Sequence, residues 1–345
     1  MRPFTLLRLN FILCSLLLLT NCSDTEEDDA VRFFQRANRT FQTGEYREAI
    51  KFYNEALEKK PDFADALNNR GLARYRIGDL PGALDDYNQA IEVDPEFWEA
   101  YFNRSEVLLD RNSPSESRQD LEKIKSVYAD SSFYHVRLGD VLVRQNNLSA
   151  AQAAYDRAIR LQPSNADALT NRGVLFFQQK QYNLAEADFR AAVAANPRQD
   201  FALNNLSLLL TRKKEYDPAL KLIDQALRLN PGQPYYLNNK GYLLLQMNRP
   251  EEAIVLIRRS LSLDDRNGWA HRNEGLYFLQ KNQPQQALPR LQQAEKLDPS
   301  VENVYAYLGQ ALRAANNLAQ ACKTWELGAK GGDELAQEYR RQFCR

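Results

Sequence analysis

Residues 64–73 read ADALNNRGLA and residues 166–175 read ADALTNRGVL, two nearly identical stretches that begin 102 residues apart. Since 102 is three times 34, we write the chain in nine rows of 34 residues and name each position in a row a place. The rows begin at residues 30, 64, 98, 132, 166, 200, 234, 268 and 302. This period indicates a chain of repeated two-helix units.

Small residues recur at two places of these rows. Place twenty holds Ala in every row but the third, where Ser117 stands. Small residues at place twenty and at place eight would let the two helices of a unit approach closely. Place twenty-four holds large residues such as Tyr87 and Trp325, which we expect to fill the space toward the next row. The small residues at place eight are Ala37, Gly71, Ser105, Gly139, Gly173, Ser207, Gly241, Gly275 and Gly309.

The 34-residue period with these small residues resembles the tetratricopeptide repeat. The resemblance implies an all-α, right-handed α-solenoid of stacked repeats with a C-terminal capping helix over residues 333–345. Pro at place thirty-two of six rows predicts where the second helix of those repeats ends. The resemblance covers residues 30–335 as nine repeats: 30–63, 64–97, 98–131, 132–165, 166–199, 200–233, 234–267, 268–301 and 302–335.

Two features depart from the repeat pattern. Arginine stands at place seven as Arg70, Arg104 and Arg172, where the consensus has Leu, and we expect its stem to pack while its head reaches water. Row three lacks the Ala at place twenty and the Pro at place thirty-two, and it carries Pro114 in its turn. We therefore expect a weaker interface at row three, without a domain break.

The first residues have the pattern of an export signal. Arg2 and Arg8 precede an apolar run that ends near Leu19, too short to span a bilayer comfortably. The next stretch, LLTNC, resembles a lipobox, which implies that residues 1–21 are a lipoprotein signal peptide and that Cys22 carries a diacylglyceryl group. We therefore expect an exported lipoprotein, anchored in the outer membrane and facing the periplasm or the cell surface.

Residues 22–29 would then form an acidic tether, with five carboxylates in SDTEEDD. One hypothesis is a solvated, flexible linker. The other is that the stretch resembles the acidic export signal of Bacteroidota surface lipoproteins, which implies transport to the outer leaflet.

Charge and residue types argue against an enzyme. The 45 basic and 45 acidic residues balance, so no long-range field attracts nucleic acid. The four cysteines lack the spacing of a zinc site, and the two histidines, His135 and His271, share place four, where other rows hold core residues. The sequence also contains no phosphate-binding loop and no nucleophile motif. We expect no catalytic residue, no metal, no cofactor and no nucleic-acid partner.

Place six holds asparagine in six rows, and the resemblance implies that it lies on the first helix of each repeat, facing the inner wall. A side-chain amide offers a donor and an acceptor together, which match one peptide unit of an extended chain. The ladder is similar to the one in O-linked N-acetylglucosamine transferase, which holds peptide backbones. The alternative is that the amides bond to a neighbouring helix. The six are Asn69, Asn103, Asn171, Asn205, Asn239 and Asn273.

Apolar residues lie beside this asparagine ladder. Places two, nine and twelve of rows five to eight include Phe177, Tyr235, Tyr242 and Trp269. Such a stripe suits a hydrophobic extended segment. The alternative is that superhelical winding buries it as core.

Two cysteines near the C-terminus are a candidate disulfide. Cys322 begins the second helix of the last row, and Cys344 ends the capping helix. Antiparallel packing makes a bridge possible, and an exported chain permits one. The pairing also resembles the C-terminal end of many Bacteroidota envelope tetratricopeptide proteins. The alternative is two buried thiols.

These observations favour a non-catalytic scaffold that binds a protein partner or an extended peptide segment on its concave surface. Two alternatives stay open. One is a structural subunit of an envelope secretion, gliding or outer-membrane assembly complex, and the other is an accessory to an envelope enzyme. The chain would meet the membrane through its lipid anchor only.

Overall fold

The computed structural model describes the backbone of residues 12–344 and the side chains of residues 26–344. The expected signal peptide, residues 1–21, and the expected lipidation site, Cys22, fall outside the residues with described side chains. Within the described range the chain forms nineteen α-helices and no strand. None of the described helices is both long enough and apolar enough to cross a membrane.

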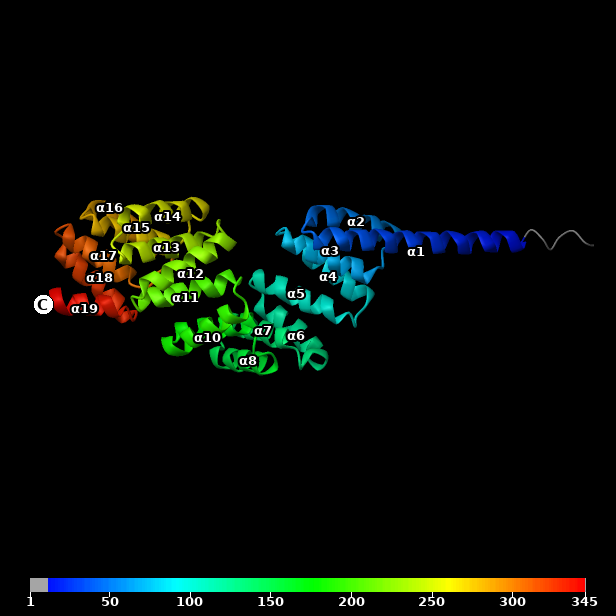
Figure 1. The fold of residues 1–345 in the computed structure, drawn as a ribbon, viewed down its shortest axis with the longest axis horizontal. Helices are drawn as coiled ribbons and strands as arrows, with labels where there is room; N and C mark the ends of the chain where they lie inside the picture. The colour runs from blue at the N-terminus through cyan, green and yellow to red at the C-terminus, as the bar shows by residue number, and fades with distance from the viewer. Residues whose placement is uncertain (1–11, 345) are drawn as a thin grey trace, which may run out of the picture. The chain divides into compact units, whose positions relative to one another are not determined.

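The helices follow one another in chain order (Figure 1). Their bounds are α1 Ile12–Gln42, α2 Tyr46–Lys59, α3 Ala64–Arg76, α4 Leu80–Val93, α5 Trp98–Asp110, α6 Pro114–Tyr128, α7 Ser132–Arg144, α8 Leu148–Leu161, α9 Ala166–Gln178, α10 Tyr182–Ala195, α11 Asp200–Arg212, α12 Tyr216–Leu229, α13 Pro234–Gln246, α14 Pro250–Leu263, α15 Gly268–Gln280, α16 Pro284–Leu297, α17 Val304–Ala314, α18 Leu318–Lys330 and α19 Glu334–Phe343.

Each row of 34 residues is one antiparallel helix pair, from α1 with α2 to α17 with α18. The turn between the two helices has the same backbone in every row, because place fifteen is always left-handed. Glycine or asparagine holds this place in seven rows, as expected for residues that tolerate positive φ, and lysine holds it in two. These residues are Gly44, Gly78, Asn112, Asn146, Lys180, Lys214, Asn248, Asn282 and Asn316.

The second helices end where the prolines predicted. The residue before the proline leaves the helical region at all six sites, for example Asp94 at φ −132° and Asp298 at φ −155°. Proline disfavours helical backbone in the residue before it, so the helix stops there. The prediction of these helix ends is confirmed.

Close approach within a pair depends on the glycine at place eight. A Cβ added to Gly71 would lie 2.8 Å from the Tyr87 ring, and one added to Gly275 would lie 2.5 Å from Leu291. The large residue at place twenty-four thus packs on the glycine of its own row, and Tyr87 also joins a cluster with Val107 of the next row. The all-α solenoid expected from the sequence is therefore present.

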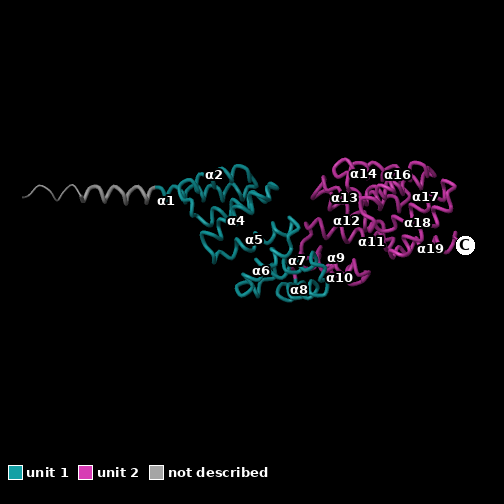
Figure 2. The backbone as a smooth tube through the Cα atoms, turned by 180° about the vertical axis from the view of Figure 1, so that it is seen from behind, with its two compact units in different colours: residues 1–163 teal, residues 164–345 magenta. Residues whose placement is uncertain are grey.

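The structure divides into two compact units, residues 1–163 and residues 164–345, shown in separate colours in Figure 2. Unit 1 holds rows one to four as α1–α8, and unit 2 holds rows five to nine with α19. The division falls in the α8–α9 connection and not in row three. In row three Ser117 stands where the other rows have alanine, and its hydroxyl donates to the Ser105 carbonyl oxygen at 2.7 Å.

The acidic segment differs from the flexible linker that was one expectation. Residues 22–29 belong to α1, so their backbone is helical. Glu26 lies 3.8 Å from the ammonium of Lys59, and Glu27 forms an ion pair with Lys60. These contacts hold the acidic stretch against the end of α2.

The C-terminal cap forms as predicted. Gly332 has a φ of +87°, and the Asp333 side chain then caps α19 by accepting from the Ala336 amide at 2.9 Å. Its other carboxylate oxygen accepts from the Ala306 amide at 3.1 Å, which joins the cap to α17. Cys322 and Cys344 form a disulfide with their Cα atoms 5.7 Å apart.

Candidate functional site

The first helices of the rows lie on the inner side of each unit. In unit 2, α9 contacts α11, α11 contacts α13, α13 contacts α15 and α15 contacts α17. Among the described residues, no second helix of this unit contacts the second helix of the next row. Stacked elements are closest on the concave side, so the first helices form that side, as the repeat resemblance implied.

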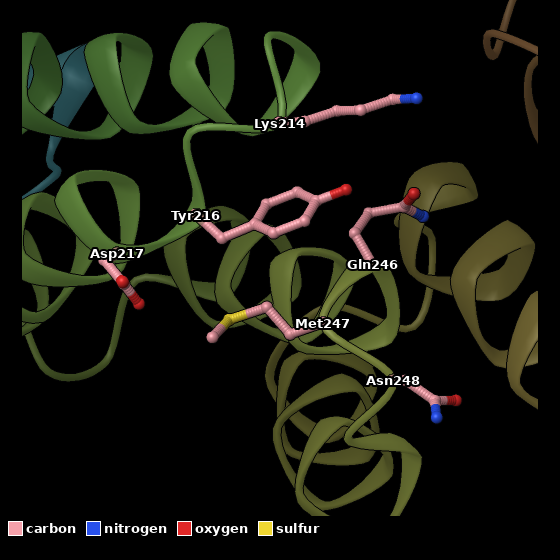
Figure 3. A pocket seen from close by; sticks show the side chains of 6 residues that line it. All are labelled: Lys214, Tyr216, Asp217, Gln246, Met247 and Asn248. Atoms are coloured by element: carbon pink, nitrogen blue, oxygen red, sulfur yellow. The ribbon is translucent and has the colours of Figure 1, made fainter.

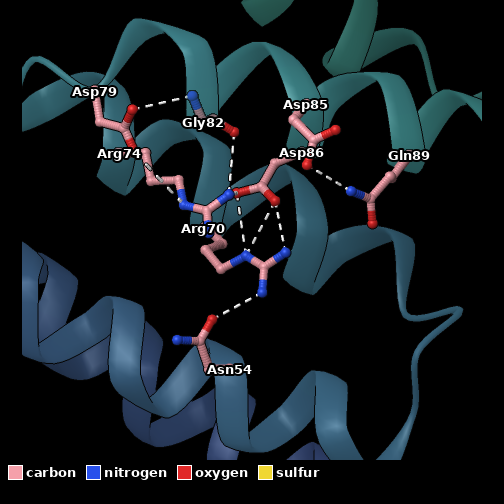
Figure 4. Close-up of polar contacts among 8 residues, drawn as sticks. All are labelled: Asn54, Arg70, Arg74, Asp79, Gly82, Asp85, Asp86 and Gln89. Carbon is pink, nitrogen blue, oxygen red and sulfur yellow. Dashed lines mark hydrogen bonds and ion pairs between the residues drawn. The ribbon is translucent and has the colours of Figure 1, made fainter.

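The arginine at place seven does not send its head into water. Arg70 donates to the Asp86 carboxylate at 2.6 and 3.1 Å and to Asn54 of the preceding row at 2.7 Å, while Arg74 adds a contact of 2.9 Å (Figure 4). Asp86 is fully buried. The expectation of a solvated head is wrong here, because a buried carboxylate sixteen residues along the chain needs a cationic partner.

The same pair recurs in other rows. Arg104 donates to Asp120 at 2.6 Å and Arg172 donates to Asp188 at 2.7 Å, and both carboxylates are buried. In the Asn-Arg-Gly motif, arginine and glycine therefore have structural roles. The glycine leaves room for the side chain at place twenty-four, and the arginine neutralises the aspartate at place twenty-three.

The asparagines form hydrogen bonds between first helices. Three pairs follow one rule, in which the place-six amide donates to the place-five amide oxygen of the preceding row. The pairs are Asn103 to Asn68 at 2.9 Å, Asn239 to Asn204 at 2.9 Å and Asn273 to Asn238 at 2.8 Å. Asn69 donates instead to Asn38 at 3.1 Å. These four asparagines therefore bond to a neighbouring helix, which was the alternative to the peptide-ladder hypothesis.

Asn273 has no exposed surface. Direct contact of its amide with a ligand, which the peptide-ladder hypothesis requires, is thus excluded in this structure by packing. Asn171 lies partly buried on α9. Asn205 differs from the bonded asparagines, because its buried Nδ2 has no partner among the described residues.

A partly open pocket of about 300 Å³ lies on the inner side of unit 2, and we name it the inner pocket. Its walls come mainly from α11, α13 and α15. Six of the ten peptide-binding candidates line it: Phe177, Asn205, Tyr235, Asn239, Tyr242 and Trp269. Asn69 and Asn103 belong to unit 1, and neither Asn171 nor Asn273 lines the inner pocket.

Three aromatic side chains at place two of successive rows line the inner pocket and remain exposed. Phe201 is 47% exposed, Tyr235 is 49% exposed and Trp269 is 36% exposed. The neighbouring Tyr236 is buried, and this burial, with the charge of Asp200, raises the pKa of its phenol. The apolar stripe is therefore partly open surface and not all core.

Three charged residues of the inner pocket were not predicted. Arg212, at the end of α11, forms an ion pair with Glu302, which precedes α17. Although partial burial works against it, the hydrogen bond and charge of Glu302 raise the pKa of Arg212. Arg272 is buried and donates to the Asn273 side-chain oxygen at 2.7 and 3.0 Å and to the Glu302 carbonyl oxygen at 2.9 Å.

Glu302 reaches the pocket because row nine starts differently. First helices of rows two to eight begin at place one, but α17 begins at place three, with Val304. Asn303 just before it is left-handed at φ 60°, outside the regular place-fifteen turns. The repeat pattern alone did not predict this later start of α17.

A second hollow, of about 400 Å³, lies between the turns that follow α11 and α13 (Figure 3). Its lining includes Lys214, Tyr216, Asp217 and Met247. Figure 3 shows the charged ends of Lys214 and Asp217 pointing in different directions.

The two histidines have packing roles. The Nε2 of His135 lies 2.9 Å from the Ala129 carbonyl oxygen, and the Nε2 of His271 lies 2.9 Å from the Asp265 carbonyl oxygen. Each ring thus holds a carbonyl group six residues earlier, just before its helix. Among the described residues, no cluster of His, Cys, Asp and Glu could hold a metal ion.

Comparisons with known proteins agree with this architecture. A family model described as a tetratricopeptide repeat matches residues 136–200, 202–268 and 272–336. Further models, described as a TPR repeat and a tetratricopeptide repeat, match residues 37–78 and 64–97. None of these matches indicates an enzymatic family. No curated protein matches the chain.

One solved structure shares the fold over most of this chain, and two shorter ones match about half of it. The crystal structure of the APC/C hetero-tetramer Cut9–Hcn1 is similar over 92% of this chain and 76% of that chain, with a TM-score of 0.65 and 13% identity. YrrB, a TPR protein with an unusual peptide-binding site, is 22% identical over 55% of this chain and 97% of its own, with a TM-score of 0.37. MamA from Desulfovibrio magneticus RS-1 is 18% identical over 50% of this chain and 98% of its own, with a TM-score of 0.45.

Proposed function

The chain belongs to the tetratricopeptide repeat family, and on that basis we propose that it is a non-catalytic scaffold whose inner pocket holds an extended peptide segment of a protein partner. Proteins of this family bind protein or peptide partners, and their fold is typical of protein–protein interaction. The observation that carries the proposal is the set of three exposed aromatic rings, Phe201, Tyr235 and Trp269, that line a pocket of about 300 Å³.

Desolvation of the exposed rings favours binding of a ligand at this site. Exposed aromatic rings gathered at one concave site lose contact with water only when a ligand covers them, and their burial favours binding. Polar side chains of the same wall, Asn205 and Asn239, lie beside these rings. An apolar wall with a few polar groups is the composition expected of a peptide groove.

The test is peptide capture by the full chain, purified in detergent, from a random twelve-residue library displayed on phage. We expect recovery of peptides whose binding depends on the two largest exposed rings. The double substitution Tyr235→Ala and Trp269→Ala should weaken the recovered peptides by about 2 kcal/mol or more, since buried aromatic anchors dominate such interfaces.

Phe133→Ala is the matched control. Phe133 stands at the same place two of row four, it is 58% exposed, and it belongs to unit 1. Its loss should leave peptide affinity unchanged. Recovery of peptides that bind the double variant as well as the parent chain would contradict a role for the inner pocket.

We further propose that the scaffold is an exported lipoprotein held in the outer membrane through Cys22. Arg2, Arg8, the apolar run up to Leu19 and the LLTNC stretch support this proposal. A Cys22→Ser chain should keep its signal peptide and fail to incorporate labelled palmitate in bacteria. Equal labelling of the parent and variant chains would refute the anchor.

A further inference from the structure

We infer that the peptide segment bound in the inner pocket carries a side-chain carboxylate, from Asp or Glu, next to a large apolar residue. The inference rests on the proposed function and names the chemistry of its ligand. Three observations lead to it: a buried arginine with no acidic partner, a net positive charge on the pocket wall, and an internal carboxylate already seated at the pocket mouth.

The buried arginine is Arg272, which is 3% exposed. No carboxylate oxygen of the described residues lies within 4.0 Å of its guanidinium. Neutral groups hold it instead, namely the Asn273 amide oxygen, the Glu302 main-chain oxygen, and the rings of Tyr242 and Trp269 at 4.9 and 5.0 Å. A buried charge without a counter-charge is unfavourable, so a ligand that supplies one gains free energy on binding.

The Arg272 guanidinium also has N–H groups that form no hydrogen bond with any described residue. Arginine carries five N–H groups, and the hydrogen bonds of Arg272 use Nε, one Nη1 and one Nη2 hydrogen. Two N–H groups therefore remain for a ligand. A carboxylate accepts paired hydrogen bonds from a guanidinium better than a neutral oxygen does.

The charge of the whole pocket agrees. Among the lining residues, Arg212, Arg272 and Glu302 carry charge near neutral pH, so two positive charges against one negative leave a net charge of +1. Because Arg272 is buried in the pocket wall, its charge is screened less than a charge on open surface. A neutral or basic segment would leave it uncompensated.

The internal carboxylate is that of Glu302. Its side chain pairs with Arg212, from a helix ninety residues earlier, and its main-chain oxygen accepts from Arg272. In the free protein the Glu302 carboxylate is thus paired with Arg212, one of the two cations of the pocket. It competes with an acidic ligand for that arginine. The pairing residues are 39% and 42% exposed, so the contact can exchange with solvent.

The ligand carboxylate is assigned to a side chain and not to a chain end. The aromatic rings come from three successive repeats on α11, α13 and α15, and an extended segment must pass several residues along them to cover all three. A large apolar residue beside the acidic one fills the aromatic wall while the carboxylate meets Arg272.

The test uses the same library of twelve-residue peptides, which are fused at their C-terminus and so present no free carboxylate end. Peptides whose capture depends on Tyr235 and Trp269 should be enriched in Asp or Glu next to Trp, Phe, Tyr or Leu. A synthetic peptide from this set should bind about tenfold or more tightly than its Asn or Gln counterpart, as expected for a hydrogen-bonded charge.

Two substitutions give opposite expected shifts. Glu302→Gln removes the internal competitor and should strengthen binding of the acidic peptide about three- to tenfold, a gain that misfolding would not produce. Arg212→Gln should weaken it by a similar factor. Glu334→Gln is the matched control, since Glu334 forms a comparable long-range ion pair with Lys180 but does not line the pocket.

Each outcome decides a separate question. Dependence on Tyr235 and Trp269 without acidic enrichment would overturn the carboxylate and leave peptide capture standing. No dependence on those rings would overturn the proposed function, and this inference with it. A synthetic peptide that needs a free C-terminal carboxylate, and loses affinity on amidation, would overturn the side-chain assignment.

Discussion

Rows two and three in unit 1 and rows six to eight in unit 2 share a framework and differ in what they expose. Asparagine pairs join the first helices in both units, as Asn103 with Asn68 and Asn239 with Asn204. Place two, however, holds the acidic residues Asp65 and Glu99 in rows two and three, while rows six to eight have Phe201, Tyr235 and Trp269 there.

The difference separates structure from recognition. Residues that both units keep, such as the asparagine pairs, hold neighbouring repeats together. Residues that only one unit has, such as the aromatic rings of α11, α13 and α15, give that unit its own surface. Four predictions test this division, from the largest expected effect to the smallest.

The buried Arg–Asp framework should carry the largest share of stability. Asp86→Ala leaves Arg70 and Arg74 without their buried partner and should lower the free energy of unfolding by about 3–5 kcal/mol. Urea unfolding measures the loss, and hydrogen exchange should locate it in unit 1. Asp85→Ala, at the exposed neighbouring residue, is the control. Equal losses in the two variants would show that the pair is not structural.

The disulfide is specific to the end of unit 2. Replacing Cys322 and Cys344 together by serine should lower stability by about 3 kcal/mol, because a loop of this length then gains freedom in the unfolded chain. Thermal melts with and without reductant measure the effect, and the double variant should not respond to reductant. Two free thiols at these positions in the denatured, unreduced chain would rule the bridge out.

The asparagine pairs should contribute equally in the two units. Asn103→Ala and Asn239→Ala each remove one amide hydrogen bond between repeats and should each cost about 1 kcal/mol. Chemical denaturation of the two single variants compares them. If Asn239→Ala weakened peptide capture while leaving stability unchanged, the peptide-ladder hypothesis would replace the structural one.

The smallest effect concerns acid sensitivity in unit 2. The hydrogen bond from Lys213 lowers the pKa of Glu186 in the folded state. The stability that this pair adds is therefore present above the unfolded-state pKa of about 4.5 and is lost as the pH falls through the lower folded value. Unfolding of the parent chain and Glu186→Gln between pH 6 and 3 should show a difference that shrinks with acidity. A difference that grew on acidification would have the wrong sign.

The repeat period predicted most of the fold. Small residues at places eight and twenty, prolines at place thirty-two and Asp333 before the cap are local signals, because each acts within one helix pair or at one helix end. Nine helix pairs and a capping helix follow from them. The sequence did not predict the division after residue 163, because that depends on how rows pack and not on any row's own residues.

The candidate site was only partly predictable. Periodicity placed Tyr235, Tyr242 and Trp269 on one side, because residues that recur at one place share a helix face. It could not show that Asn273 is buried or that Asn205 keeps an unpaired amide nitrogen, since both depend on the adjoining repeats.

The sequence by itself determined that this protein is a stack of helix pairs, because the signals for that lie within each 34-residue row. Only the tertiary structure decided where Glu302 goes, since it meets Arg212 from ninety residues away and Arg272 from thirty. Contacts across that separation arise when several repeats bend around a common side, and no single row contains the information for them.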